Sequence, residues 1–224
     1  MELQFSNMTQ SRPIREVAYE QLKHAIITGE LPAGSRIVET SFAEQLHISR
    51  TPLREALQKL EHDGLVEYIP HHGVSVKAFT ISDIEEVFII RNSMMMLLLP
   101  SIVERATDRD IAQLDEILKI MDGALERDDI DALALYNRKF HRGLEHLSDK
   151  RRILMVIDSQ EEYIMRFSAI AIASITRRGT AHQEHHQMLE LLKQKDLEGL
   201  KTLTQHHLDE SKDTCLNAVK NRGF

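Results

Sequence analysis

Two histidines near the C-terminus of the chain lie on apolar helical faces, where their imidazoles could bind a metal ion. His185 lies three and seven residues before Met188 and Leu192, and residues at these spacings share one face of a helix. His207 follows Leu203 by four residues, so it continues a second apolar stripe. Both side chains are therefore expected to point into the protein.

A third histidine, His141, lies in the segment NRKFHRGLEHL, directly after Phe140 and four residues after Asn137. A single inward histidine is usually a core residue whose polar atoms are satisfied. Three of them on separate helices favour a metal site, because buried neutral imidazoles need partners and one divalent ion serves them all. The interior of a helical bundle is a usual place for such a site.

Two other interpretations of these histidines remain open. His182 and His186 are four residues apart and would form a site at the surface, but we see nothing else in the sequence that converges on this pair. Three histidines with an open coordination position also describe a catalytic zinc. A metalloenzyme would need a general base, and the candidates are near the histidines in sequence only: Glu145, Glu184 and Asp158.

The composition favours a mainly helical protein outside the membrane. The 224 residues include only nine glycines and five prolines, and no run of about 18 apolar residues could span a bilayer. The N-terminus lacks the segments of a secretory signal. The single cysteine, Cys215, fits a reducing compartment. We therefore expect a cytoplasmic protein with no membrane partner.

The charge balance limits how the chain could bind nucleic acid. The formal net charge is −7, and residues 1–78 carry eight Lys and Arg against ten Asp and Glu. This argues against broad non-specific binding to nucleic acid. Any contact with DNA must come from a few well-placed side chains.

The N-terminal third contains three predicted helices, over residues 13–27, 39–46 and about 49–63. Ser49 or Thr51 can cap the third helix, with a proline in its first turn and Gly64 at its end. Its buried stripe leaves Arg50, Thr51 and Arg54 exposed at the N-terminal end. Side chains at this position could read DNA bases or hold phosphates.

Two short β-type runs follow, at residues 65–69 and 74–78, joined by Pro70-His71-His72-Gly73. Three helices followed by a hairpin form the layout of a winged helix-turn-helix, whose second helix of the turn enters the major groove. The hairpin tip can touch the minor groove. The alternative is a small domain of the same layout whose arginines are only solvated.

From residue 79 onward the pattern predicts helices only. Ser82-x-x-Glu85 and Thr107-x-x-Asp110 have the form of capping boxes. Helices are expected over about 82–105, 107–127, 129–147, 149–175, 180–194 and 196–219. Their short connections favour an antiparallel bundle of six to seven helices. The run Met94–Leu98 is expected in the core or in a dimer interface.

The fold class is thus mainly α, with a winged helix-turn-helix over residues 10–78 and a helical bundle over residues 79–224. The run from Glu30 to Val76, with SRTPLREAL at its centre, resembles the DNA-binding domain of the GntR family of bacterial transcription regulators. The resemblance implies operator contacts from the third helix and the hairpin, by Arg50, Thr51, Arg54, His72 and Gly73. The family usually has an arginine where this chain has Thr40, so the operator is expected to differ from the commonest one.

The bundle resembles the FCD ligand-sensing domain that defines the FadR subfamily of these regulators. The resemblance rests on Asn137-x-x-Phe140-His141-x-x-Leu144, Glu184-His185 and His207-Leu208. It implies that Asn137, His141, His185 and His207 are metal ligands, although the first position is commonly aspartate. It also implies that Arg91 can pair with the carboxylate of an effector. The alternative is a solvated or structural arginine at this position.

Together these features predict a DNA-binding transcriptional regulator, a repressor rather than an enzyme. The resemblance implies a small organic acid as effector, bound with a divalent metal, Zn²⁺ before Ni²⁺ or Mn²⁺. A homodimer would place two reading heads on a pseudo-palindromic operator in double-stranded DNA. An acyl-CoA effector without a metal is the alternative within the same family, and the three histidines argue against it.

Overall fold

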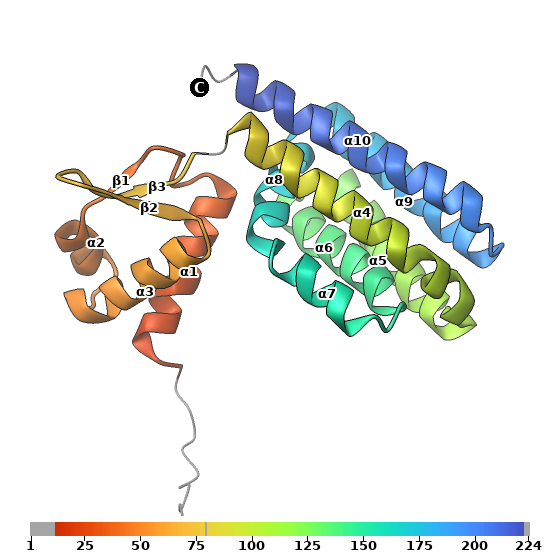
Figure 1. Ribbon diagram of the computed structural model, residues 1–224, viewed down its shortest axis with the longest axis horizontal. Coiled ribbons are helices and arrows are strands. Elements are labelled where there is room, and N and C mark those ends of the chain that lie inside the picture. Colours follow the sequence, from red (N-terminus) through yellow and green to blue (C-terminus); the bar gives the residue numbers. More distant parts are fainter. Residues whose placement is uncertain (1–11, 79, 222–224) are drawn as a thin grey trace, which may run out of the picture. The chain divides into compact units, whose positions relative to one another are not determined.

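The computed structural model describes residues 12–78 and 80–221 and divides into two compact units, one on each side of residue 79 (Figure 1). Each unit has a hydrophobic core of its own. Ten helices and three strands lie in the described ranges. The fold is mainly α, as the sequence predicts.

The first unit contains three helices and a small antiparallel sheet. Its elements in chain order are α1 (Ile14–Thr28), β1 (Arg36–Ile37), α2 (Glu39–Gln45), α3 (Arg50–His62), β2 (Val66–Ile69) and β3 (Gly73–Val76). The strand order is β1-β3-β2. Helices α2 and α3 form the helix-turn-helix, and β2 and β3 form the hairpin of the wing, which confirms the predicted layout.

The backbone at the ends of these helices explains where they stop. Gly29 ends α1 with a φ of 85°, in the left-handed region where glycine is not strained. His47, in the turn between α2 and α3, has a φ of 52°. Helix α3 starts at Arg50, one residue after Ser49, although the Ser49 side chain makes no capping hydrogen bond. Leu53, Leu57 and Leu60 are buried on one face of α3, so the opposite face is exposed to solvent.

Strand β1 was not predicted from the sequence. It pairs with β3 through Arg36 opposite Ser75 and Ile37 opposite Val74. Two residues are too few to show the alternation by which a strand is recognised. The strand closes the sheet on the side away from β2, so the wing rests on the core of the unit through Ile37.

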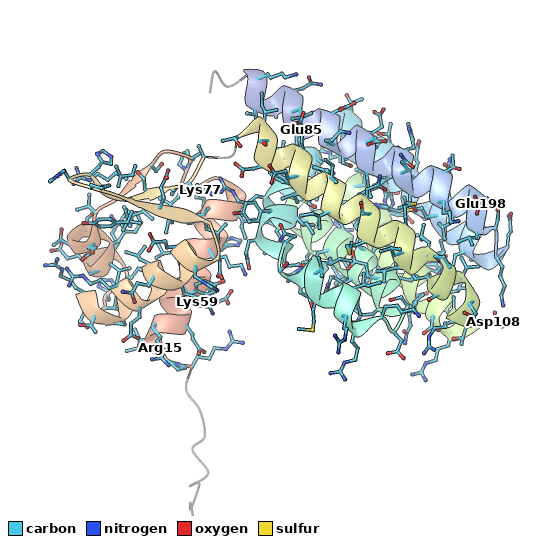
Figure 2. The ribbon with its side chains drawn as sticks, viewed as in Figure 1. Arg15, Lys59, Lys77, Glu85, Asp108 and Glu198 are labelled. Atoms are coloured by element: carbon cyan, nitrogen blue, oxygen red, sulfur yellow. The ribbon has the colours of Figure 1, made fainter. Side chains whose placement is uncertain are left out.

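The second unit is a bundle of seven helices within residues 80–221 (Figure 1). They are α4 (Ile81–Arg105), α5 (Asp108–Glu126), α6 (Ile130–His146), α7 (Arg151–Asp158), α8 (Glu161–Ala173), α9 (Ile175–Lys193) and α10 (Leu197–Asn221). Helices α4 and α10 lie side by side and run in opposite directions. Figure 2 shows this through Glu85, near the start of α4, and Glu198, near the start of α10, which lie at opposite ends of the bundle.

Two capping boxes fix the starts of α4 and α5. At Thr107 the hydroxyl accepts a hydrogen bond from the Asp110 N–H while the Asp110 carboxylate accepts one from the Thr107 N–H, as predicted. The prediction for α4 was wrong by two residues. The box is made by Thr80 and Asp83 rather than by Ser82 and Glu85. An aspartate closes both boxes, where glutamate or glutamine is the usual partner.

The helix predicted over 149–175 is two helices, and the next begins earlier than expected. Helix α7 ends at Asp158 and α8 begins at Glu161. Ser174 has an extended ψ of 112°, and its hydroxyl accepts a hydrogen bond from the Arg177 N–H, so it caps α9. The continuous apolar pattern of this segment hides both breaks, because each is made by one or two residues.

Helix α4 packs against α6, α7, α8 and α10. Met95, Leu98, Leu99 and Ile102 are buried on it, whereas Leu97 is 57% exposed. The methionine run thus mainly fills the core, as one of the two predicted roles requires. By length and composition α4 could cross a membrane, but about half of its apolar window (44%) is buried inside the unit. This is the pattern of a core helix.

Candidate functional site

Three helices bring His141, His185 and His207 together in the interior of the bundle. The ring centroids of His141 and His185 are 4.9 Å apart, those of His141 and His207 are 5.4 Å apart, and those of His185 and His207 are 4.8 Å apart. A possible metal-binding nitrogen of each ring lies within 4.8 Å of one on each of the others. The convergence that the helical phases predict is therefore present in the structure.

Packing on each helix fixes the direction of these rings. His141 and Phe140 are both buried on α6, and their rings meet edge to face with centroids 5.8 Å apart. Phe140 also contacts the His185 ring on α9, at 4.8 Å between centroids. The phenyl ring thus forms an apolar wall against His141 and His185.

Burial keeps the imidazoles neutral. It lowers the pKa of His141 and of His185 well below the usual value, and the positive charge of Arg177 adds to the effect on both. Burial also lowers the pKa of His207, although the hydrogen bond with Glu184 acts in the opposite direction. A metal ion binds the neutral imidazole.

The nitrogens of His185 have no hydrogen-bond partner among the described residues. Both Nδ1 and Nε2 are buried. A buried polar atom without a partner costs about 1–3 kcal/mol. A divalent cation would satisfy one of these nitrogens, together with one nitrogen each from His141 and His207. The donor set therefore fits a metal such as zinc.

His207 is held by an ion pair that the sequence analysis did not identify. Its Nδ1 lies 2.6 Å from Glu184 Oε2, and the two guanidinium nitrogens of Arg177 donate to the two Glu184 oxygens at 2.8 Å each. One of them also donates to the His207 carbonyl. This leaves Nε2 of His207 as the nitrogen available for a metal, the arrangement by which a carboxylate orients a ligating histidine.

The Glu184 carboxylate is ionised in this position. Burial alone would raise its pKa, but the hydrogen bonds with His207 and Arg177 outweigh burial and lower the pKa to about 2. Glu184 is therefore a weak base, and both of its oxygens already accept hydrogen bonds from Arg177. Glu145 is buried beside Arg142, and Asp158 pairs with the same arginine.

A cavity adjoins the histidine cluster. Its volume is about 40 Å³, counted over the positions open to the centre of a water molecule, which suffices for a few waters or a small polar ligand. Asn137 and Arg91 both line it, beside the three histidines. Arg91 is buried, and its Nε has no partner in the part of the chain that the structure describes.

The predicted DNA-reading residues lie together on the surface of the first unit. Arg50, Thr51 and Arg54 are exposed at the start of α3. Glu39 on α2 accepts from Arg54 Nε at 2.7 Å and from Arg50 at 3.3 Å. Sequence reasoning missed Glu39. Its ion pairs hold both guanidinium groups on one side of α3, and the exposed Thr40 follows it in the chain.

The other two predicted DNA contacts lie at the tip of the hairpin between β2 and β3. The His72 N–H donates to the Ile69 carbonyl at 3.0 Å, which closes the turn. His71 and Gly73 have φ values of 63° and 90°, so the turn depends on a residue that tolerates the left-handed region. The His72 side chain is exposed.

The prediction for His182 and His186 was incomplete. His182 is only 5% exposed, and a carboxylate does converge on the pair. Asp122 Oδ1 on α5 lies 2.6 Å from His182 Nε2 and 2.9 Å from His186 Nε2. The sequence gives no sign of this contact, because Asp122 lies 60 residues before His182.

Comparison with known proteins agrees with both units. Residues 14–76 match the family described as bacterial regulatory proteins, gntR family, and residues 86–210 match the FCD domain. The chain is 29% identical over 199 residues to the HTH-type transcriptional regulator YdhC of Bacillus subtilis, covering 88% of this chain and 87% of that protein.

Two Escherichia coli proteins are also similar. The HTH-type transcriptional repressor RspR is 20% identical over 205 residues, which cover 92% of this chain and 90% of that protein. The solved structure of McbR/YncC has a TM-score of 0.76 at 24% identity and covers 93% of this chain and 99% of that one. The chain therefore belongs to the GntR family of DNA-binding transcriptional regulators, with an FCD domain as its C-terminal unit, and it is not an enzyme.

Proposed function

We propose that this regulator is a cytoplasmic repressor whose affinity for its operator is controlled by a small carboxylate, bound with a divalent metal in the bundle. The observation that carries the proposal is the cluster of His141, His185 and His207, with both nitrogens of His185 unpaired among the described residues. Zinc is the metal that this set of donors favours, with nickel and manganese as alternatives.

The cavity supports a small acid as the effector. Arg91 is a buried cation next to the three histidines. A guanidinium binds a carboxylate through two parallel hydrogen bonds, in a bidentate pair. A bound metal would supply a second positive charge to the same carboxylate. A long acyl chain needs an extended apolar space, and a cavity of about 40 Å³ beside four histidines and two arginines is a poor fit for one.

Asn137 is the remaining proposed ligand. It lines the cavity one helical turn before His141, so its side-chain oxygen could complete the metal site. A neutral amide contributes less to cation binding than a carboxylate does. We expect a weaker metal site than one with aspartate at this position.

The DNA-binding unit supports a dimer that reads two half-sites. Arg50, Thr51, Arg54, His72 and Gly73 provide one small reading surface per chain, with Thr40 at its edge. An acidic chain gains little affinity from overall charge, so two copies on a pseudo-palindrome would supply the specificity. Ile89 and Leu97 are exposed at 64% and 57% on α4 and are candidates for the contact between copies.

The experiment begins with selection of an operator from random double-stranded DNA by the full-length, zinc-loaded protein. Operator affinity is then measured with a series of small mono-, di- and tricarboxylic acids. We expect one class of acid to lower the affinity by about 5- to 150-fold, and a reporter gene behind the operator to be repressed until that acid is added. The similarity to the repressor RspR supports this sign of regulation.

Arg91→Gln and Arg138→Gln form a matched pair for this experiment. Arg138 is an exposed arginine on α6 that pairs with Glu161. We expect Arg91→Gln to retain DNA binding and lose the response, and Arg138→Gln to behave like the wild type. Failure to enrich any DNA sequence would refute the DNA-reading surface. A response that survives in Arg91→Gln would refute the effector site.

A further inference from the structure

A second group of possible metal ligands lies outside the three-histidine cluster. Asp122 on α5 and His182 and His186 on α9 place one ligand atom each within 4.8 Å of the others. Both histidines present Nε2 to the same carboxylate oxygen, at 2.6 and 2.9 Å. Two histidines four residues apart lie on one helical face, which is the spacing by which zinc-binding helices hold a metal.

This group is distinct from the buried cluster. His185 lies between the two histidines in sequence but belongs to the buried set, and its ring centroid is 6.4 Å from that of His182. The side chains of Asp122 and His186 are 46% and 42% exposed, whereas that of His182 is 6% exposed. The group is therefore accessible to solvent at Asp122 and His186 and buried at His182.

The three ligand atoms lie close to the spacing that a metal site requires. Asp122 Oδ1 lies within hydrogen-bond distance of both imidazoles, so the three side chains already meet at one point. An ion with bonds of about 2.1 Å needs its ligand atoms roughly 3.3 Å apart, and the exposed Asp122 and His186 can move outward to make this room.

We propose that Asp122, His182 and His186 form a second divalent-cation site, which exchanges readily with solvent and links α5 to α9. Two imidazoles and one carboxylate leave coordination positions open for water, and this set suits zinc and similar first-row metals. Because His182 also lines the effector cavity, an ion here stiffens one wall of that cavity. The inference does not depend on the proposed effector or on DNA binding.

The ordinary alternative is that Asp122 only accepts hydrogen bonds from the two histidines. The two possibilities differ in the number of ions that the chain binds. Full-length protein stripped with a chelator is titrated with Zn²⁺ alone, by calorimetry and by equilibrium dialysis. We expect the wild type to bind about two ions per chain, the second more weakly than the first.

Four variants assign the two binding events. His186→Ala and Asp122→Asn are expected to lose the weaker event and keep the tighter one, because both residues are partly exposed and tolerate replacement. His141→Ala is expected to lose the tighter event only. His146→Ala removes an exposed histidine of the same unit and should bind both ions.

The outcomes separate this site from the buried one. A wild type that binds a single ion, which is lost in His141→Ala, would overturn the second site and leave the buried site intact. Two ions that persist in both His186→Ala and Asp122→Asn would overturn it as well. Loss of the weaker event in those two variants alone would establish it, and thermal melts of the stripped proteins check that every variant is folded.

Discussion

Replacement of Arg177 by alanine is expected to lower the free energy of unfolding of the metal-free protein by about 3–5 kcal/mol. Arg177 is 5% exposed, and its two terminal nitrogens donate to both oxygens of Glu184. The variant would leave the Glu184 carboxylate buried beside His207 without its cation. Removal of one partner from a buried ion pair costs far more than the pair itself contributes, because the remaining charge stays desolvated.

The same replacement should weaken the proposed metal site. Arg177 holds Glu184, and Glu184 orients His207 through Nδ1. Loss of such a supporting contact typically reduces metal affinity by about 10- to 100-fold. Arg177→Lys should fall between the wild type and the alanine variant, since an ammonium cannot donate to both carboxylate oxygens in the manner of a guanidinium.

Arg105 provides the control for this prediction. It pairs with Asp149 at the surface of the same unit, and the two side chains are 53% and 66% exposed. Exposed pairs contribute about 0–1 kcal/mol. Urea denaturation of the two alanine variants, both stripped of metal, gives the comparison. A loss below about 1 kcal/mol in Arg177→Ala, similar to that in Arg105→Ala, would contradict the role given to the buried pair.

Replacement of Arg54 by alanine is expected to lower the affinity for the operator by more than about tenfold at physiological salt. A guanidinium that contacts a guanine through two hydrogen bonds contributes about 1–3 kcal/mol of discrimination. A dimer loses this contact twice, so the affinity should fall by roughly 30-fold to 10⁴-fold. The ion pair that Arg54 makes with Glu39 is partly exposed to solvent, so it would oppose the transfer of Arg54 to DNA only weakly.

Arg15 is the control for the DNA-binding prediction. It is an exposed arginine of the same unit that pairs with Glu55 on the surface, and its removal lowers the net charge by the same amount. Fluorescence anisotropy with the selected operator and with scrambled DNA separates the two effects. Equal losses in Arg54→Ala and Arg15→Ala, on both DNAs, would show that Arg54 contributes charge alone and reads no base.

The sequence predicted the helices better than their ends. Apolar periodicity identified the long helices of the bundle because each buries a stripe over several turns. The breaks at residues 159–160 and at Ser174 involve one or two residues and leave that periodicity intact. Thr80 and Ser82 each lie three positions before an acidic residue, so the sequence pattern alone does not distinguish the two possible starts of α4.

The sequence also predicted only part of the candidate site. Helical phase placed His141, His185 and His207 in one interior, since each lies on the apolar face of its own helix. Helical phase could not identify Asp122 and Arg177, the residues that contact His182 and His207. Asp122 lies beside charged residues on α5, and Arg177 is a charged side chain buried on α9. Only the packing of α5 and α10 against α9 brings them to His182 and His207.

The central claim is that His141, His185 and His207 hold a divalent ion inside the bundle. The most direct test is elemental analysis of full-length protein purified without chelator or metal-affinity resin and then dialysed to remove weakly held ions. We predict about one zinc, nickel or manganese ion per chain in the wild type and none in His185→Ala. A metal content that is unchanged by His185→Ala, or a wild type that takes up no metal even when zinc is supplied, would contradict the claim.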